Sequence, residues 1–294
     1  MFPENLGENF GGLILKLESE KNELVNDKEE IIRKLSNLII DAVKKRIENK
    51  KLIGIAFSGG IDSTLLAFIC HKLNKGFKLY SVGLENSSDL KYAEQIAKEF
   101  NWKIERKILS LNEAESIIKN VVNVLNSDDV VWIGVGSVTY SVLQMAKKDN
   151  VDILLNGLGS EEIFAGYERH KLRIDFNDVN EECWRGLKNL WGRDMKRDSK
   201  IVSEFGINVK CPFLDEEVIR FAMRIPENFK INKETSKIIL RETAFNIGLK
   251  KELTIRKKKA AQYGSNFDKA ILKLAKSKGF KTKKDYLLNL KNEK

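Results

Sequence analysis

The spacing of hydrophobic residues predicts alternating helices and strands over more than half of the chain. Between residues 28 and 48, apolar side chains recur every three or four positions, which is typical of an amphipathic helix. The short apolar run LIGIAF at 52–57 has the character of a buried strand. A second helix should begin near Asp62, because Asp62, Ser63 and Thr64 favour helix starts.

The same alternation continues to the middle of the chain and then stops. Further strands are predicted at 78–84, 102–109 and 152–157, and further helices at 90–100, 112–125 and 136–148. This order indicates an α/β fold, a doubly wound parallel sheet with helices on both faces. Beyond about Tyr167 the strand signals stop, so we expect a helical remainder. The chain then divides into an irregular lead-in (1–28), an α/β unit with a leading helix (29–167) and a helical C-terminal part (168–294).

Composition excludes several classes of protein. Hydrophobic residues make up 42% of the chain and charged residues 32%, which suits a soluble protein with a real core. No apolar run reaches the ~20 residues of a membrane-spanning helix, and the acidic N-terminus lacks a signal-peptide pattern. We therefore expect a cytoplasmic protein that does not bind membranes. Three isolated cysteines and two histidines argue against a disulfide framework, a Cys- or His-rich metal site and a Ser-His-Asp triad.

The net charge of +10 is concentrated at the C-terminal end. From Lys250 onward the chain carries 15 lysines and arginines but only four acidic residues. Such a run is either a solvated face of the last helices or a site for polyanions such as nucleotide phosphates or RNA. The run 256–259 is its densest part, because four adjacent cations repel one another unless an anion offsets them.

The most informative motif is SGGIDS at 58–63, where a predicted strand leads into a predicted helix. Gly59 and Gly60 let the backbone approach a ligand closely, so that amides of the loop and of the helix start converge on an anion. Asp62 would repel a bare phosphate, so its presence implies a bridging Mg²⁺. The loop is not a Walker A motif, because no GK[ST] follows. The sequence therefore predicts a phosphate site.

This loop resembles that of the PP-loop (HUP-like) ATP pyrophosphatases, which split ATP into AMP and pyrophosphate to adenylate a substrate. Other segments resemble asparagine synthetases in particular and occur in that family's order. They are 81–97, NGLGSEEIFAGY at 156–167 (like SGEGSDEVFGGY), CPFLD at 211–215 (like VPFLD), Lys237 to Arg241 (KxxLR) and Arg256 to Lys258 (RxK). Within the family, AGYERH at 165–170, Gly-Arg-Asp at 192–194 and KKAAQYGS at 258–265 resemble the asparagine synthetase domain-containing protein 1 group. The resemblance covers about residues 30–270.

The resemblance implies ATP and Mg²⁺ as cofactors and assigns roles to individual residues. It places Phe57 and Val82 beside adenine and ribose, and Asn156 and Gly157 near the ribose and α-phosphate. The residues implied at the pyrophosphate are Ser58, Gly59, Gly60, Asp62 and Ser63. Asp62 and Glu161 would bind the metal, and Lys258 is the cation that steadies the transferring phosphate. Charge that develops on departing pyrophosphate does require a metal, amide donors and a cation already in place. Asp62, Glu161 and Lys258 are thus the expected catalytic residues. Lys237 and Arg241 either bridge helices or belong to the site.

Two departures from the family's pattern bear on the reaction. Glutamine-dependent members begin with a catalytic cysteine and a glutaminase domain, whereas here Phe2 occupies that position and only about 50 residues precede the first strand. We therefore expect nitrogen from free ammonia or from a separate glutaminase subunit. Leu158 replaces a glutamate that manages protons at the acyl-adenylate, and leucine can neither accept a proton nor pair with an ammonium group. ATP binding should survive this change, whereas aspartate amidation stays open.

Three functions follow from these observations. The first is an asparagine-synthetase-like ligase that adenylates a small carboxylate, aspartate by default, for amide formation with ammonia. The second is a PP-loop enzyme that modifies tRNA, which the basic C-terminal run motivates. The third is an ATP-binding pseudoenzyme that acts with a partner, which Leu158 motivates.

Overall fold

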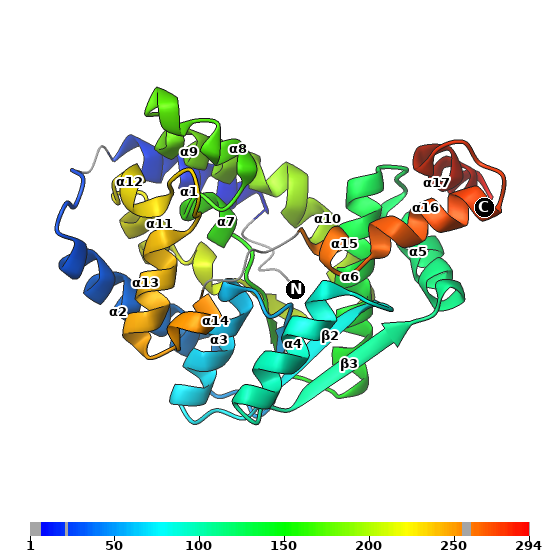
Figure 1. The fold of residues 1–294 in the computed structure, drawn as a ribbon, viewed down its shortest axis with the longest axis horizontal. Coiled ribbons are helices and arrows are strands. Elements are labelled where there is room, and N and C mark those ends of the chain that lie inside the picture. The colour runs from blue at the N-terminus through cyan, green and yellow to red at the C-terminus, as the bar shows by residue number, and fades with distance from the viewer. Residues whose placement is uncertain (1–6, 21–22, 255–259, 294) are drawn as a thin grey trace.

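The core of the molecule is a five-stranded parallel sheet covered by helices on both faces (Figure 1). The computed structural model describes residues 7–20, 23–254 and 260–293. The strand order is β3-β2-β1-β4-β5, so the chain winds outward from β1 to β3 and then crosses to β4 on the other side of β1. This reversal defines a doubly wound sheet and confirms the predicted α/β fold. The strands are β1 (Ile53–Ala56), β2 (Phe77–Leu84), β3 (Ile104–Leu109), β4 (Ile153–Leu155) and β5 (Asn208–Lys210).

The central strands are apolar because both of their faces are covered. Ile53 and Ile55 of β1 are fully buried, as are their partners Ile153 and Leu155 in β4. A strand that is buried on both faces has a continuous run of apolar residues, whereas a half-exposed strand alternates apolar and polar residues. The sequence of the central strands therefore already contains the information that helices cover both faces.

The helices surround this sheet and account for most of the chain. The first are α1 (Gly7–Ser19), α2 (Lys28–Ile47), α3 (Ile61–Lys72), α4 (Ser88–Glu99), α5 (Leu111–Leu125) and α6 (Val130–Lys148). Then follow α7 (Ser160–Ile163), α8 (Glu168–Lys171), the 3₁₀-helix η2 (Ile174–Phe176), α9 (Val179–Leu190), the π-helix η3 (Trp191–Met195), α10 (Lys196–Phe205) and the 3₁₀-helix η4 (Pro212–Leu214). The last are α11 (Glu216–Ala222), α12 (Glu227–Lys230), α13 (Ile238–Ile247), α14 (Lys251–Thr254), α15 (Ala261–Gly264), α16 (Phe267–Ser277) and α17 (Lys283–Asn292).

The two layers of helices follow from the order of the strands. Parallel crossovers are right-handed, so α3 and α4, which follow β1 and β2, cover one face, and α5 and α6, which follow β3, cover the other. The leading helix α2 packs beside α3, and α10 packs beside α6. Figure 1 shows α3 and α4 in front of the sheet and α6 behind it.

The structure corrects the predicted lead-in and the purely helical C-terminal part. Residues predicted to be irregular form helix α1, whose stripe of Phe10, Ile14 and Leu17 is buried. Strand β5 lies in the part predicted to be helical, and it pairs with β4. The predicted α/β unit 29–167 therefore does not contain the whole sheet.

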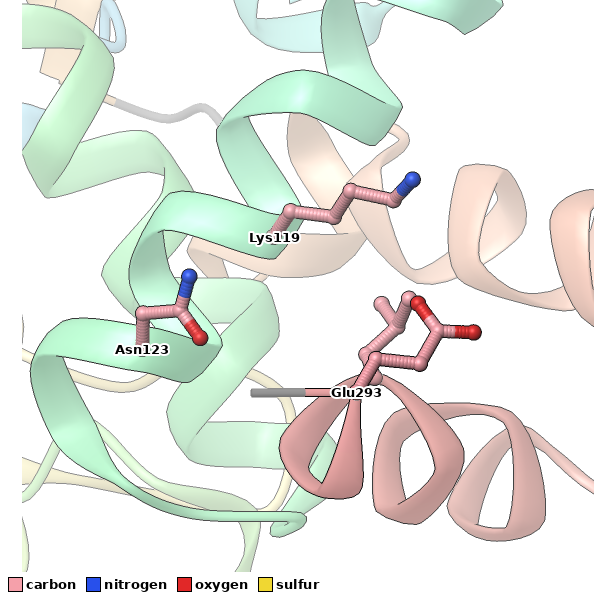
Figure 2. Close-up of a pocket in the computed structure, with 4 residues that line it drawn as sticks. Lys119, Asn123 and Glu293 are labelled. Atoms are coloured by element: carbon pink, nitrogen blue, oxygen red, sulfur yellow. The ribbon is translucent and has the colours of Figure 1, made fainter.

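Among the last helices, α15 packs against α6, α16 against α5 and α6, and α17 against α5 (Figure 1). Lysines in this part form ion pairs, for example Lys278 with Glu115 at 2.8 Å and Lys283 with Asp268 at 2.6 Å. These pairs offset the charges of the two lysines, and both interpretations of the basic run stay predictions. A hollow of about 390 Å³ lies here, between α5 and the end of α17, lined by Lys119, Asn123, Leu290 and Glu293. Figure 2 shows Lys119 and Asn123 on one side of it and Glu293 on the other. None of the predicted site residues lines it. Within the described ranges, no helix combines the length and apolarity needed to cross a membrane.

Candidate active site

The two loops that carry the predicted motifs meet at one edge of the sheet. The SGGIDS loop leaves β1 and the NGLGSEE loop leaves β4, and these strands are neighbours where the winding reverses. The carboxyl ends of strands at such a switch point are the usual ligand site of an open α/β sheet. The N–H of Phe57 donates to the Tyr80 carbonyl and that of Asn156 to the Lys210 carbonyl, both at 2.9 Å. Each loop therefore starts from a position fixed by a neighbouring strand, β2 for the first loop and β5 for the second.

The loop after β1 has the backbone of an anion cradle. Gly59 adopts φ +68°, and a Cβ there would lie 2.9 Å from the backbone nitrogen of Ala93, so only glycine fits. Gly60 is the N-cap of α3, and it provides no side-chain oxygen for the first N–H groups of that helix. Ser63 Oγ donates to the Gly60 carbonyl at 3.2 Å, and the Gly60 N–H points to Ser58 Oγ at 3.3 Å. The start of α3 is thus built to receive negative charge.

A buried hydroxyl in the first turn of α3 also fits an anionic ligand. Thr64 is fully buried, and its Oγ1 has no hydrogen-bond partner among the described residues. Buried hydroxyls nearly always have a partner in folded proteins. A phosphate oxygen at the loop is a group that this hydroxyl could satisfy.

The predicted metal-binding carboxylates converge on one buried lysine. Lys237 Nζ lies 2.7 and 2.9 Å from the two carboxylate oxygens of Asp62, 2.9 Å from Glu161 Oε1 and 3.0 Å from Ser160 Oγ. Asp62 and Lys237 are each only 2–3% exposed. Lys237 adopts φ +57°, an unusual left-handed conformation for lysine. A Cβ on Gly166 would collide with both Glu161 and Lys237, so glycine leaves the space that this cluster fills.

These residues fit a magnesium ion bound together with phosphates. Asp62 and Glu161 point their oxygens at a single position that already holds a positive charge, and carboxylate oxygens are ligands that Mg²⁺ prefers. In the part of the chain that the structure describes, no group of three or more His, Cys, Asp or Glu side chains could form a complete metal cage. Mg²⁺ usually keeps water and phosphate ligands in such sites. Arg241 lies near the same two carboxylates; burial lowers its pKa, and the carboxylates oppose that shift.

The structure brings most of the predicted site residues together. Phe57 and Val82 are buried, at the ends of β1 and β2. Asn156 is half-buried, and its side-chain oxygen accepts the N–H of Leu158 at 3.0 Å. The side chain of Leu158 packs against the core and offers no proton acceptor. Lys258, with its basic run, lies outside the described residues, so its role stays a prediction.

Sequence reasoning did not assign the most central residue of the cluster. Lys237 is 175 positions away from Asp62, and the spacing of residues along the chain gives no sign that the two meet. The KxxLR resemblance was the only available signal, and it left helix bridging and site membership open. The buried hydroxyl of Ser160, which contacts Lys237, gave no signal beyond its place in the second motif.

Comparison with known proteins defines the class to which this fold and site belong. The family model for asparagine synthase matches residues 34–177 and 174–285, so the chain belongs to the asparagine synthase family. A Methanocaldococcus jannaschii protein provisionally named asparagine synthetase 1 (glutamine-hydrolysing) is 34% identical over 87% of this chain and 53% of its own length. Asparagine synthetase B of Escherichia coli is 28% identical over 74% of this chain and 42% of its own length. The chain thus spans about half the length of these relatives.

Solved structures with a similar arrangement are more distant. An NMN synthetase from Francisella tularensis is 16% identical, covers 72% of this chain and 97% of its own, and gives a TM-score of 0.35. An NH₃-dependent NAD synthetase from Campylobacter jejuni is 17% identical, covers 70% and 96%, and gives a TM-score of 0.33.

Proposed function

We propose that this chain is an ATP-dependent ligase that adenylates a small carboxylate, aspartate by default, and transfers the acyl group to ammonia. The observation that carries the proposal is the cluster of Asp62, Glu161 and Lys237 beside the phosphate loop. Membership of the asparagine synthase family supports the same class of reaction. Mg²⁺ with ATP is the proposed cofactor, and Asp62 and Glu161 are its proposed protein ligands.

The first step makes a mixed anhydride. A carboxylate oxygen of the substrate attacks the α-phosphorus of ATP, and the bond from that phosphorus to the bridging oxygen breaks, so pyrophosphate leaves with the electron pair. To the amides at Gly59 and Gly60 and the first turn of α3 we assign the stabilisation of the developing charge, which the glycine backbone and the uncapped helix start support. Bound Mg²⁺ would neutralise phosphate charge and orient the leaving group. We assign Lys258 the role of steadying the transferring phosphate.

The second step transfers the acyl group to nitrogen. Ammonia attacks the acyl carbon, AMP leaves with the electrons of the C–O bond, and the nitrogen loses a proton. Leu158 cannot take that proton, so another acceptor must receive it. The apolar side chain at Leu158 also removes a partner for the substrate's ammonium group. The choice of carboxylate is therefore the part of the proposal that needs testing first.

The decisive experiment follows α-labelled ATP with Mg²⁺ and ammonium, with and without aspartate. AMP and asparagine that appear only with aspartate would support the full proposal. AMP formed without an aspartate requirement would retain adenylation and redirect the search to other carboxylates or to tRNA. ATP binding without any AMP, even when a panel of small carboxylates and tRNA is added, would contradict the proposal and leave a nucleotide-binding module that acts with a partner. The Asp62→Asn variant is the matched negative control.

A further inference from the structure

Helix α7 presents two neighbouring glutamates to two different environments. It has a single turn, closed by the N–H of Ile163 on the Gly159 carbonyl at 3.1 Å and that of Phe164 on the Ser160 carbonyl at 3.1 Å. Successive helical residues point about 100° apart. Glu161 therefore faces Lys237, whereas Glu162 points away from it and is fully buried. A helix this short depends on its side-chain contacts for a fixed orientation.

Two side chains hold the buried glutamate. Tyr167 donates its hydroxyl to Glu162 Oε1 at 2.8 Å, and Arg193 donates Nη2 to the same oxygen. Arg193 Nη2 also lies 3.2 Å from the Tyr167 hydroxyl, so the three side chains form a closed triangle. Burial raises the pKa of Glu162, and the guanidinium of Arg193 opposes that rise. A carboxylate buried this deeply is strongly destabilised when its partner is removed.

Arg193 is itself held in place by the segment that carries it. It lies in the π-helix η3, a geometry that is frequent at functional sites. Its Nε donates to Asp194 at 2.6 Å, and Asp194 accepts in turn from Arg197 at 3.0 Å. Arg197 is almost fully buried and pairs with Asp198 at 2.8 Å. The ion pair of Arg193 with Glu162, which we call the anchor of α7, is therefore the first in a connected series of ion pairs that extends into α10.

We propose that Arg193, together with Tyr167, is a positioning residue that sets the orientation of Glu161 by anchoring Glu162. The inference rests on the proposed binding of Mg·ATP at Asp62 and Glu161. It also gives a role to two sequence strings that the proposed function leaves unused: AGYERH supplies Tyr167, and Gly-Arg-Asp at 192–194 supplies Arg193. The structure joins them through Glu162, although Tyr167 and Arg193 are 26 positions apart.

The surroundings of Arg193 make it suitable for substitution. Its side chain is 34% exposed and borders an open hollow of about 520 Å³ between α9 and η3. Arg185 lines the same hollow and forms ion pairs with Glu182 at 3.2 Å and Asp178 at 3.4 Å, but none with α7. Arg185→Met thus removes a neighbouring arginine from the same hollow and leaves Glu162, Tyr167 and Arg193 in place. It is the matched control.

The test measures binding rather than turnover. A non-hydrolysable ATP analogue is titrated calorimetrically into wild type, Arg193→Met, Arg193→Lys and Arg185→Met at several Mg²⁺ concentrations. Loss of a residue that orients a metal ligand costs about 10–100-fold in metal affinity. We expect Arg193→Met to need at least about tenfold more Mg²⁺ for half-maximal binding, Arg193→Lys to recover part of this, and Arg185→Met to match wild type.

A double-mutant cycle separates positioning from general stability. If Arg193 acts through Glu162, Arg193→Met should add little to the Mg²⁺ requirement in a Glu162→Gln background. An unchanged Mg²⁺ requirement in folded Arg193→Met would overturn the inference, as would equal effects of Arg193→Met and Arg185→Met. Absence of Mg²⁺-dependent binding in wild type would instead overturn the proposed function. The two failures are therefore distinguishable.

Discussion

Gly157 and Asp62 approach so closely that a Cβ added to Gly157 would lie 2.9 Å from the Cβ of Asp62. The contact joins the loop after β4 to the first turn of α3. It places the backbone of one motif directly against the proposed metal ligand of the other. Side chains larger than hydrogen at residue 157 must therefore displace one of the two loops.

Gly157→Ala should impair nucleotide binding more than it impairs folding. Overpacking of this kind costs about 1–3 kcal/mol of stability. Because the displaced residue is Asp62, we also expect at least about tenfold weaker binding of an ATP analogue with Mg²⁺, measured calorimetrically. Gly12→Ala is the control, since nothing lies within 4 Å of a Cβ there and alanine favours the helix. Equal binding by both variants would contradict the prediction.

Lys237→Met should be destabilised in a way that Mg²⁺ reverses. Without the ammonium, Asp62 and Glu161 repel each other at a buried position, and removal of one partner of a buried ion pair costs about 3–5 kcal/mol. A divalent cation can take over the role of the lost charge. Thermal unfolding should therefore show a larger rise in Tm on addition of Mg²⁺ for the variant than for wild type.

A second buried lysine provides the control for that measurement. Lys230 is fully buried, its pKa is lowered by burial, and its ammonium contacts the sulfur of Met223 at 3.8 Å. Lys230→Met should be neutral or stabilising, and its Tm should respond to Mg²⁺ as wild type does. A similar response in all three proteins would count against a cation site at Lys237.

His170 should make stability fall on acidification. Its Nδ1 accepts the Tyr167 N–H at 3.0 Å, and burial, helped by Arg169 and Lys230, lowers its pKa from the ordinary 6.5 to about 3. Between these values the unfolded chain binds a proton that the folded one does not. The contribution of His170 to the free energy of unfolding is therefore complete above pH 6.5 and is lost as the pH falls. At pH 5 the loss is about 2 kcal/mol. His170→Asn, which retains an acceptor, should show a shallower loss between pH 7 and pH 5 in urea unfolding.

The three cysteines should be unreactive in the folded protein. Cys70, Cys183 and Cys211 are buried and unpaired, and burial raises the pKa of Cys70 and of Cys211 to about 12. The thiolate is the reactive form, so little of it exists at neutral pH. A thiol reagent such as DTNB should label all three quickly in urea and very slowly in buffer. Fast labelling of a native thiol would mean that the region opens locally.

The sequence carried more information about the first half of the chain than about the second. Predicted strands at 52–57 and 78–84 match β1 and β2 closely, and the first is the continuous apolar run expected of a buried parallel strand. Strand β5 has three residues, Asn208 to Lys210, with only one apolar side chain, so it carries no pattern. Helix α1 was not predicted because Gly11 and Gly12 are typical of irregular segments, although Phe10, Ile14 and Leu17 have helical spacing.

The candidate site divides along the same line. The glycine-rich loop between strand and helix was enough to predict a phosphate site and, through Asp62, a bridging metal, whereas Glu161 was expected from the resemblance to asparagine synthetases; these roles stay predictions. The position of Lys237 depends on how α13 packs against α2 and α3, and no local pattern encodes that packing. The contacts among Glu162, Tyr167 and Arg193 also depend on tertiary packing, so no local pattern predicts them. Short strings shared with a group of relatives marked two of these residues without revealing their contact.

Strand β5 also determines how the molecule must be assembled during synthesis. Until Lys210 has been made, β4, which contains the apolar residues Ile153 and Leu155, is an outer edge of the sheet with unpaired backbone groups. Such an edge is a template for pairing with another chain. A fragment cut at residue 167 should consequently aggregate rather than fold. The sheet is complete only when β5 has been made, so we expect the nascent protein to be most vulnerable in the interval between translation of β4 and of β5.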